Sequence, residues 1–192
     1  MDTLIKALLA CVIGLAVGLW ATVLALRDAR GFDTAAIGPW TVSERAGAID
    51  ADPYTRAALE RSGEIPLAVG EGLQFVARAD DSGAALNPRC VYLVGGATPP
   101  TRYWTLSLID RQGFPVDNPM GRYGFRSSEI LRGADGGFAI AVSAQAHAGN
   151  WLPIGADRRF GLALRLYDTP LGATAGAIEK SAMPRIVRES CP

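Results

Sequence analysis

The first strong pattern along the chain is an unbroken run of apolar and small residues from Ala7 to Leu26. Lys6 precedes this run and Arg27 follows it. At ~1.5 Å rise per residue, about 20 residues form a helix of about 30 Å, the hydrocarbon thickness of a bilayer. The pattern therefore predicts one transmembrane helix, with residues 1–27 as an N-terminal anchor that contacts the lipid bilayer through residues 7–26.

A cleaved signal peptide is the alternative for this run. Signal peptides have an apolar region of roughly 7–15 residues, followed by a cleavage site of small residues. The run here is longer and ends at Leu26 and Arg27 without such a site, so we expect an uncleaved anchor. The flanking charges, Lys6 against Arg27 and Arg30, favour a cytoplasmic domain only slightly.

The next segments are predicted to be a linker at 28–39 and one folded domain at 40–192. A short helix begins the domain, because Asp52 suits an N-cap, Pro53 fits the first turn and Gly63 suits the C-terminal stop.

From Leu73 onward the apolar positions alternate with polar or small ones, which is typical of half-buried antiparallel strands. Turn residues at 80–83 and 110–113 separate some of these segments, and 127–132 is predicted to form one helical turn. The predicted strands are 73–77, 89–94, 103–108, 138–143 and 160–167, the last of them being the clearest.

These elements predict a mainly β fold, a jelly-roll-like antiparallel sandwich with one or two short helices, preceded by a single transmembrane helix. No regular helical segment follows each strand, which disfavours a parallel α/β sheet. About 165 residues after the anchor suffice for one domain with a core.

Composition narrows the function classes. Lys+Arg and Asp+Glu both number 19, so the net charge is zero and nucleic-acid binding is disfavoured. The chain has one histidine, His147, and no Cys/His cluster, so we expect no metal site and no cofactor. A hydrolase acting on an envelope glycan or ester, with carboxylates such as Asp110 or Asp117, is the enzymatic alternative, but a non-catalytic role is favoured.

Two segments are chemically richer than the rest. Residues 117–123 form an Asn-Pro turn that carries an arginine beside a tyrosine, and 149–153 is predicted to be a loop that carries an amide and an indole. Such groups bind a polar ligand and stack on its apolar face, or they tie strands together as structural residues. Arg165 completes the set, because it lies mid-strand and needs a carboxylate or carbonyl partner if its face of the sheet is covered. The candidate ligand-binding residues are Asn118, Arg122, Tyr123, Asn150, Trp151 and Arg165.

Cys90 and Cys191 are the two cysteines of the aqueous part, and Cys11 lies in the apolar run. An even pair suits a disulfide in an oxidising compartment, where closing a loop of ~100 residues stabilises a fold by about 4–5 kcal/mol. Two unrelated buried thiols are the alternative, and spacing alone leaves both open.

Several motifs in order resemble the domain-of-unknown-function family 1214. The likeness extends from near residue 38 to the closing Cys191-Pro192, and it implies a jelly-roll-like β domain in a bacterial envelope protein. The compact layout resembles the short members, whereas longer members add a second domain. The motifs are Gly38-Pro39-Trp40, residues 50–56, residues 102–108, Asp117-Asn118-Pro119 with Arg122-Tyr123, residues 149–153 and residues 164–168.

The resemblance also implies a disulfide between Cys90 and Cys191, which places the domain in the periplasm, on a single-pass protein of the bacterial inner membrane. It carries no established activity. The favoured function is therefore binding of an envelope ligand or protein partner, with the hydrolase and a structural scaffold of a membrane complex as alternatives.

Overall fold

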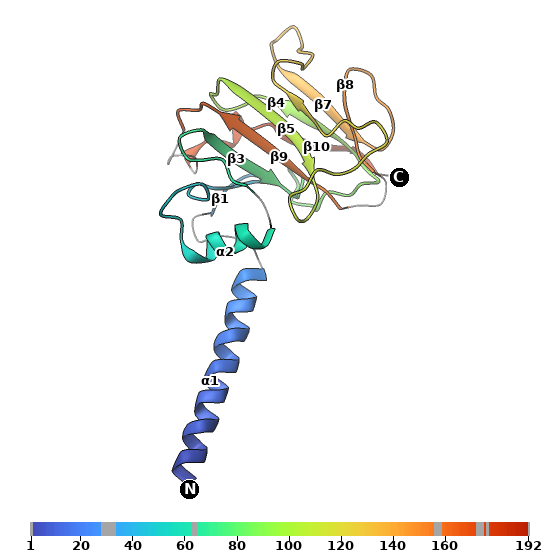
Figure 1. The fold of residues 1–192 in the computed structure, drawn as a ribbon. Helices are drawn as coiled ribbons and strands as arrows, with labels where there is room; N and C mark the ends of the chain where they lie inside the picture. The colour runs from blue at the N-terminus through green and yellow to red at the C-terminus, as the bar shows by residue number, and fades with distance from the viewer. Residues whose placement is uncertain are drawn as a thin grey trace.

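The computed structural model describes residues 2–27, 34–62, 65–155, 159–171, 175 and 177–191. Within these ranges, a long N-terminal helix precedes a mainly β domain built from two sheets (Figure 1). Gly63, the predicted helix stop, lies outside the described residues, as do residues 28–33 of the predicted linker.

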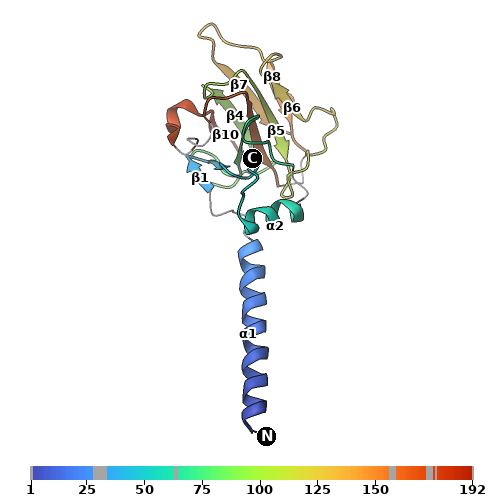
Figure 2. The ribbon, with the colours of Figure 1, turned by 60° about the vertical axis from the view of Figure 1, so that its left-hand side comes forward.

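Helix α1 (Asp2–Arg27) contains the predicted apolar run. Its stretch Asp2–Ala25 is long and apolar enough to cross a membrane, and none of it is buried against the described part of the chain. At ~1.5 Å per residue these 24 residues extend about 36 Å, slightly more than a hydrocarbon core. Figures 1 and 2 both show α1 projecting away from the sheets.

Helix α2 (Pro53–Ser62) begins where the sequence predicts it. Asp52 Oδ1 accepts hydrogen bonds from the backbone N–H groups of Tyr54 (2.9 Å) and Thr55 (3.0 Å), which confirms its role as N-cap. The Thr55 hydroxyl also donates to Asp52 Oδ2, and this bond is the main reason that the pKa of Asp52 lies below its ordinary value.

One sheet has six strands, and every neighbouring pair in it is antiparallel. Its order is β1 (Thr34–Ile37), β2 (Trp40–Ser43), β3 (Gly72–Ala77), β9 (Gly161–Tyr167), β5 (Tyr103–Ile109) and β6 (Gly124–Arg126).

The second sheet has four strands and is mixed. The pairs β10/β4 and β4/β7 are antiparallel, whereas β7 and β8 are parallel. Its order is β10 (Arg185–Ser190), β4 (Val91–Gly96), β7 (Phe138–Ser143) and β8 (Asn150–Pro153), and a short 3₁₀ turn η2 (Lys180–Ala182) precedes β10.

The inner faces of both sheets meet in one hydrophobic core. The predicted alternation is confirmed in β5, where the buried Leu106 and Leu108 alternate with half-buried residues. In β9 the leucines Leu162 and Leu164 are buried as predicted, but the small residue Ala163 between them is buried as well. The four-stranded sheet contributes a matching set of fully buried side chains: Tyr92, Val94, Ile140, Val142, Leu152 and Ile186.

The prediction of a purely antiparallel sandwich was wrong at β8. Six residues, 144–149, carry the chain from the end of β7 back beside its start, so β8 runs parallel to β7. Parallel neighbours usually need a connection of about a dozen residues or more, so nothing in the local sequence announces this arrangement. The mainly β, two-sheet class is confirmed, and the jelly-roll topology stays a prediction.

Several boundaries also differ from prediction. The linker was predicted through Pro39 and the domain from residue 40, but the first sheet already includes β1, which turns into β2 at Gly38 (φ 60°). The predicted helical turn at 127–132 is a tight turn after β6. The strand predicted at 160–167 is not the last, because β10 follows it. Strand β1 has four residues and β10 has one buried residue, so neither shows a periodic apolar pattern in the sequence.

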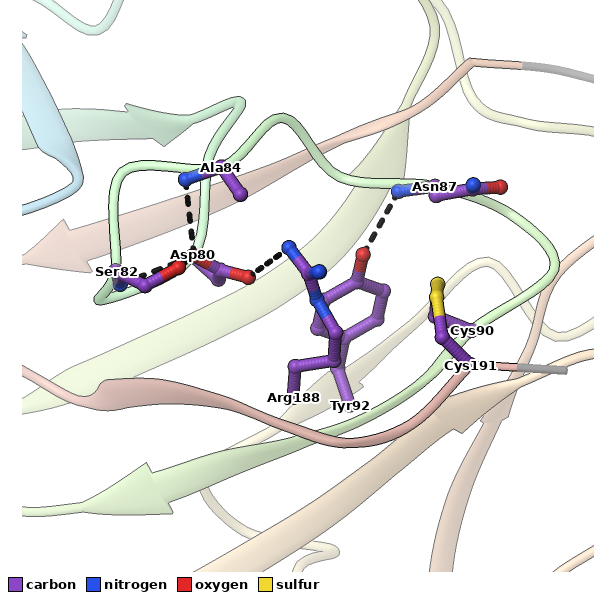
Figure 3. A network of polar contacts seen from close by, with 8 residues as sticks. All are labelled: Asp80, Ser82, Ala84, Asn87, Cys90, Tyr92, Arg188 and Cys191. Carbon is purple, nitrogen blue, oxygen red and sulfur yellow. Dashed lines mark hydrogen bonds and ion pairs between the residues drawn. A yellow bond between two sulfur atoms is a disulfide. The ribbon is translucent and has the colours of Figure 1, made fainter.

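Strand β10 is held to the loop between β3 and β4 by polar contacts and a disulfide (Figure 3). Its Arg188 forms an ion pair with Asp80, whose carboxylate is buried, and the Asp81 N–H donates to the Ile186 carbonyl (2.9 Å). Asp80 Oδ1 meanwhile accepts from the backbone N–H groups of Ser82 (3.0 Å) and Ala84 (3.1 Å). One carboxylate therefore organises its own turn and binds the C-terminal strand.

The predicted disulfide joins Cys90 to Cys191 across 101 positions of the sequence and closes the far end of β10 onto β4. Cys11 is a free cysteine on the exposed surface of α1. Together with Asp80, the disulfide fixes β10 at two separate points.

The environment of Asp80 favours its charged form. Burial raises the pKa of this carboxyl, but hydrogen bonds from Ser82, from Arg188 and from the Ala84 and Ser82 amides act in the opposite direction. Their sum outweighs burial, so the pKa of Asp80 lies below its ordinary value.

We expect Asp80→Asn to lower the free energy of unfolding at neutral pH by about 1.5–3 kcal/mol, the range for buried hydrogen bonds to charged groups. Asn keeps an acceptor for the turn but loses the ion pair with Arg188. Because the folded pKa of Asp80 is depressed, its stabilisation is present above pH 3.8 and is lost as the pH falls below that value. Urea unfolding of both proteins at neutral pH and at about pH 3 measures the two effects.

Asp81→Asn is the matched control. Asp81 pairs with Arg185, whose side chain is mostly exposed, so we expect a change within about 0.5 kcal/mol. Equal losses in the two variants would contradict the role assigned to Asp80.

Candidate functional site

A hollow of about 340 Å³ lies among the segments that flank β6, β7 and β8. We call it the distal hollow, because both views place β7 and β8 on the side of the domain away from α1 (Figures 1 and 2). Three of the six candidate residues, Arg122, Asn150 and Trp151, meet here although up to 29 positions separate them. The remaining lining residues are Phe125, Glu129, Leu131, His147 and Gly149.

Arg122 brings a positive charge to the distal hollow. Its guanidinium lies over the ring of Phe125, 4.7 Å from the centroid, and Phe125 is itself buried in β6. This cation–π contact limits where the charge sits. Arg122 is exposed, and among the described residues its guanidinium forms no ion pair.

Asn118 lies outside the distal hollow and positions Arg122. Its side chain is buried, its Oδ1 accepts from the N–H groups of Met120 and Arg122 (3.2 Å each), and its Nδ2 donates to the carbonyls of Val116 (3.3 Å) and Arg122 (3.0 Å). These four bonds close the turn that carries Arg122. Both polar atoms of the Asn118 side chain are thus engaged with the backbone of its own turn.

Asn150 opens strand β8, so the prediction that residues 149–153 form a loop was wrong. Its carboxamide accepts from the Leu131 N–H (2.8 Å) and donates to the carbonyls of Leu131 (2.7 Å) and Ala139 (3.0 Å). These bonds tie β8 to the strand-like segment beyond β6 and to the start of β7. They use both amide hydrogens, so Asn150 shapes the hollow and does not donate into it.

Trp151 is the second residue of β8 and is half-buried. Its Nε1–H donates to the Ser143 carbonyl at 3.1 Å, which fixes the ring against the end of β7. Because this donor is occupied, the indole offers its apolar ring to the hollow.

Glu129 and His147 line the hollow but were not among the predicted site residues. Glu129 Oε1 accepts from the Arg126 N–H (3.0 Å), which holds its turn, and His147 is exposed in the loop between β7 and β8. A lone histidine among alanines and glycines shows no motif. Only the return of the chain at 144–149 brings it near Arg122.

Tyr123 and Arg165 lie elsewhere. The Tyr123 hydroxyl points to Asp117 Oδ1 at 3.4 Å and the ring is exposed. Arg165 lies on the outer side of the six-stranded sheet, where its Nε donates to Gln74 Oε1 at 2.6 Å. The expectation that Arg165 finds a carbonyl partner is confirmed, and the structure does not bring it to the distal hollow.

A larger groove of about 850 Å³ lies between α2 and the outer side of β2 and β3, and it contains none of the six candidate residues. Three charged residues on its wall are engaged in polar contacts. Arg78 donates to the carbonyls of Asp110 (3.1 Å) and Arg111 (3.4 Å), while Asp80 and Asp81 pair with strand β10. Glu44 and Arg111 also line the groove, but its described lining contains no aromatic side chain, unlike that of the distal hollow.

Asp110 and Asp117, the acids named for a hydrolase, occupy the loop between β5 and β6. Asp110 Oδ1 accepts from the N–H groups of Gln112 (2.8 Å) and Phe114 (3.0 Å), so it caps its own turn. In the ranges that the structure describes, no group of three or more His, Cys, Asp and Glu residues is arranged to hold a metal ion.

We expect Asn150→Ala to lower the free energy of unfolding by about 1–2 kcal/mol, because it removes three part-buried hydrogen bonds to the backbone of residues 131 and 139. Thermal and urea denaturation measure this loss. Tyr123→Phe is the control, since it removes only a long contact at an exposed site and is expected to change stability by less than about 0.5 kcal/mol. A fully stable Asn150→Ala would show that the amide is free to serve a ligand.

A family model described as "Protein of unknown function (DUF1214)" matches residues 71–171, more than half of the chain. No curated protein matches the chain. The crystal structure of the VPA0106 protein from Vibrio parahaemolyticus is similar in fold, with a TM-score of 0.61 and 19% identity over 93% of this chain and 44% of that one. An uncharacterized protein from Burkholderia cenocepacia has a TM-score of 0.42 and 20% identity over 93% of this chain and 51% of that one. The chain thus spans about half the length of these solved proteins, 44% and 51%. With its matched region running from β3 to just beyond β9, the chain belongs to the DUF1214 family.

Proposed function

We propose that this protein is a membrane-anchored envelope protein whose β domain, of jelly-roll type, binds a ligand or protein partner in the distal hollow. One observation carries the proposal: the Arg122 guanidinium has no ion pair within the described residues and is held on Phe125 in the same hollow as the Trp151 ring. Positioned cations without a partner, next to a rigid apolar ring, are typical of binding sites.

The chemistry of the hollow favours a ligand that carries an acidic group. A guanidinium gives a carboxylate two parallel charge-assisted hydrogen bonds, while an indole packs against the apolar side of a sugar or side chain. The imidazole of His147 adds a polar group to the hollow. The side chains of Asn118 and Asn150 are engaged in hydrogen bonds to the backbone that forms its walls. A volume of about 340 Å³ suits a monosaccharide acid or an acidic side chain.

The apolar helix α1 and the disulfide support a proposal for the anchor and the compartment. We propose that α1 remains attached as a single membrane span, and that the β domain lies on the periplasmic side of a bacterial inner membrane. The Cys90–Cys191 disulfide supports this side, because disulfides persist in oxidising compartments.

Arg122→Gln is expected to weaken binding of galacturonic acid and N-acetylmuramic acid at least about tenfold, which corresponds to ~1.4 kcal/mol, without changing the melting temperature. The reason is loss of the charge-assisted hydrogen bonds to the carboxylate. Ligand-observed NMR titration of the full chain in detergent measures the affinities. Galactose and N-acetylglucosamine, which lack the acid, are expected to bind the natural protein as weakly as the variant binds the acids.

Arg126→Gln is the matched control, since Arg126 is an exposed arginine at the end of β6 that does not line the hollow. It is expected to bind the acidic sugars as the natural protein does. Equal weakening by the two substitutions, or binding of neither acid, would count against the distal hollow as the site.

A reporter that is active only in the periplasm is expected to be active when fused after Pro192, and the chain is expected to resist alkaline carbonate extraction of membranes. Adding a reductant to the sample before electrophoresis is expected to change the gel mobility of the natural chain but not that of Cys90→Ser. A reporter active only in the cytoplasm would overturn the compartment, and a chain found in the soluble fraction would overturn the anchor.

A further inference from the structure

The β domain exposes two isoleucines beside α2. Ile49 is 96% exposed and Ile65 is 88% exposed, more than any other large apolar side chain outside α1 among the described residues. Tyr54, in the first turn of α2, is also exposed. Exposed branched aliphatic side chains gathered on one side of a domain indicate a surface that is covered in the working molecule.

These side chains lie at the end of the domain nearest α1. Helix α2 contacts α1, and Figures 1 and 2 both place α2 between α1 and the sheets. Ile49 precedes α2 by four positions and Ile65 follows it by three. We call Ile49, Tyr54 and Ile65 the collar.

The collar does not take part in the groove between α2 and the sheet. Thr55, Ala58 and Leu59 of α2 line the groove against β2 and β3, whereas none of the three collar residues is part of that lining. One side of α2 therefore covers the sheet, and the three collar residues stay exposed outside the groove.

Chain length keeps the collar close to any membrane that α1 spans. Seven steps of the chain separate Arg27 from Thr34, and an extended chain covers at most about 3.5 Å per step, or roughly 25 Å. The 24-residue apolar stretch, about 36 Å long, already reaches beyond a hydrocarbon core of about 30 Å. The domain thus begins within reach of the lipid headgroups.

Building on the membrane anchor of the proposed function, we infer that the collar contacts the headgroup layer of the bilayer and directs the distal hollow away from the membrane. Isoleucine and tyrosine are residues that enter this layer, tyrosine because one end of its ring is polar. Residues 45–69 carry three basic and four acidic residues, so apolar contact and not charge drives the docking.

The test uses the full chain in phosphatidylcholine vesicles, with Cys11→Ser as background so that the disulfide is the only other cysteine chemistry. An environment-sensitive thiol probe is attached at Ile65→Cys or, as control, at Leu131→Cys, an exposed leucine of the distal hollow. Lipids with a spin label near the headgroup are expected to quench the probe at position 65 several-fold more strongly than the probe at 131. Ile49→Asp in the position-65 protein is expected to reduce that quenching.

The outcomes separate the collar from the anchor. A chain that does not float with the vesicles contradicts the anchor itself. A chain that floats, with equal quenching at 65 and 131, keeps the anchor and overturns the collar. Quenching that appears only with anionic lipid would show charge-driven contact, and quenching that falls as protein is added would show that a second copy covers the collar; either result overturns the inference.

Discussion

Strand β10 contributes little apolar burial, so its position in the fold depends on polar contacts and on a disulfide. Of its six residues, Ile186 is the one that is buried. The Asp80–Arg188 ion pair, the Cys90–Cys191 disulfide and the bond from Trp40 Nε1 to the Pro184 carbonyl (2.8 Å) link it to β4 and to the opposite sheet. They let β10 cover β4, which would otherwise be an unpaired edge.

At the other edge of the same sheet, strand β8 is also held by side-chain contacts, and the distal hollow lies beside it. Strand β8 returns beside β7 after a short loop, and the side chains of Asn150 and Trp151 bind the backbone on both sides of that return. Their polar atoms bind part-buried backbone groups, since most side-chain hydrogen bonds in folded proteins go to backbone or water. Arg122, His147 and the indole ring of Trp151 also line the hollow, and these are the groups to which we assign ligand binding in the proposed function.

The two proposals assign different tasks to opposite ends of one small domain. The end with α2 lies against α1 and carries the apolar collar, while the end with β7 and β8 carries the uncommitted guanidinium. A rigid two-sheet core between them makes the orientation of one end determine that of the other. A protein with no net charge gains no long-range attraction to a surface, which leaves such local contacts to set its orientation.

Local patterns in the sequence were sufficient for the membrane-length helix, the Asp52 cap of α2, and strands β3, β5, β7 and β9, because periodicity and capping depend on neighbours a few residues apart. The family resemblance supplied the disulfide, which spacing alone left open. Tertiary structure decided the rest. The short strands β2 and β10 pair with strands far away in the sequence, the edge strand β1 pairs with the adjacent β2, and the parallel register of β8 beside β7 does not show in the local sequence. The same long-range pairing placed His147 and Glu129 beside Arg122 and sent Arg165 to the far side of a sheet, since contacts between segments are set by topology and not by sequence distance.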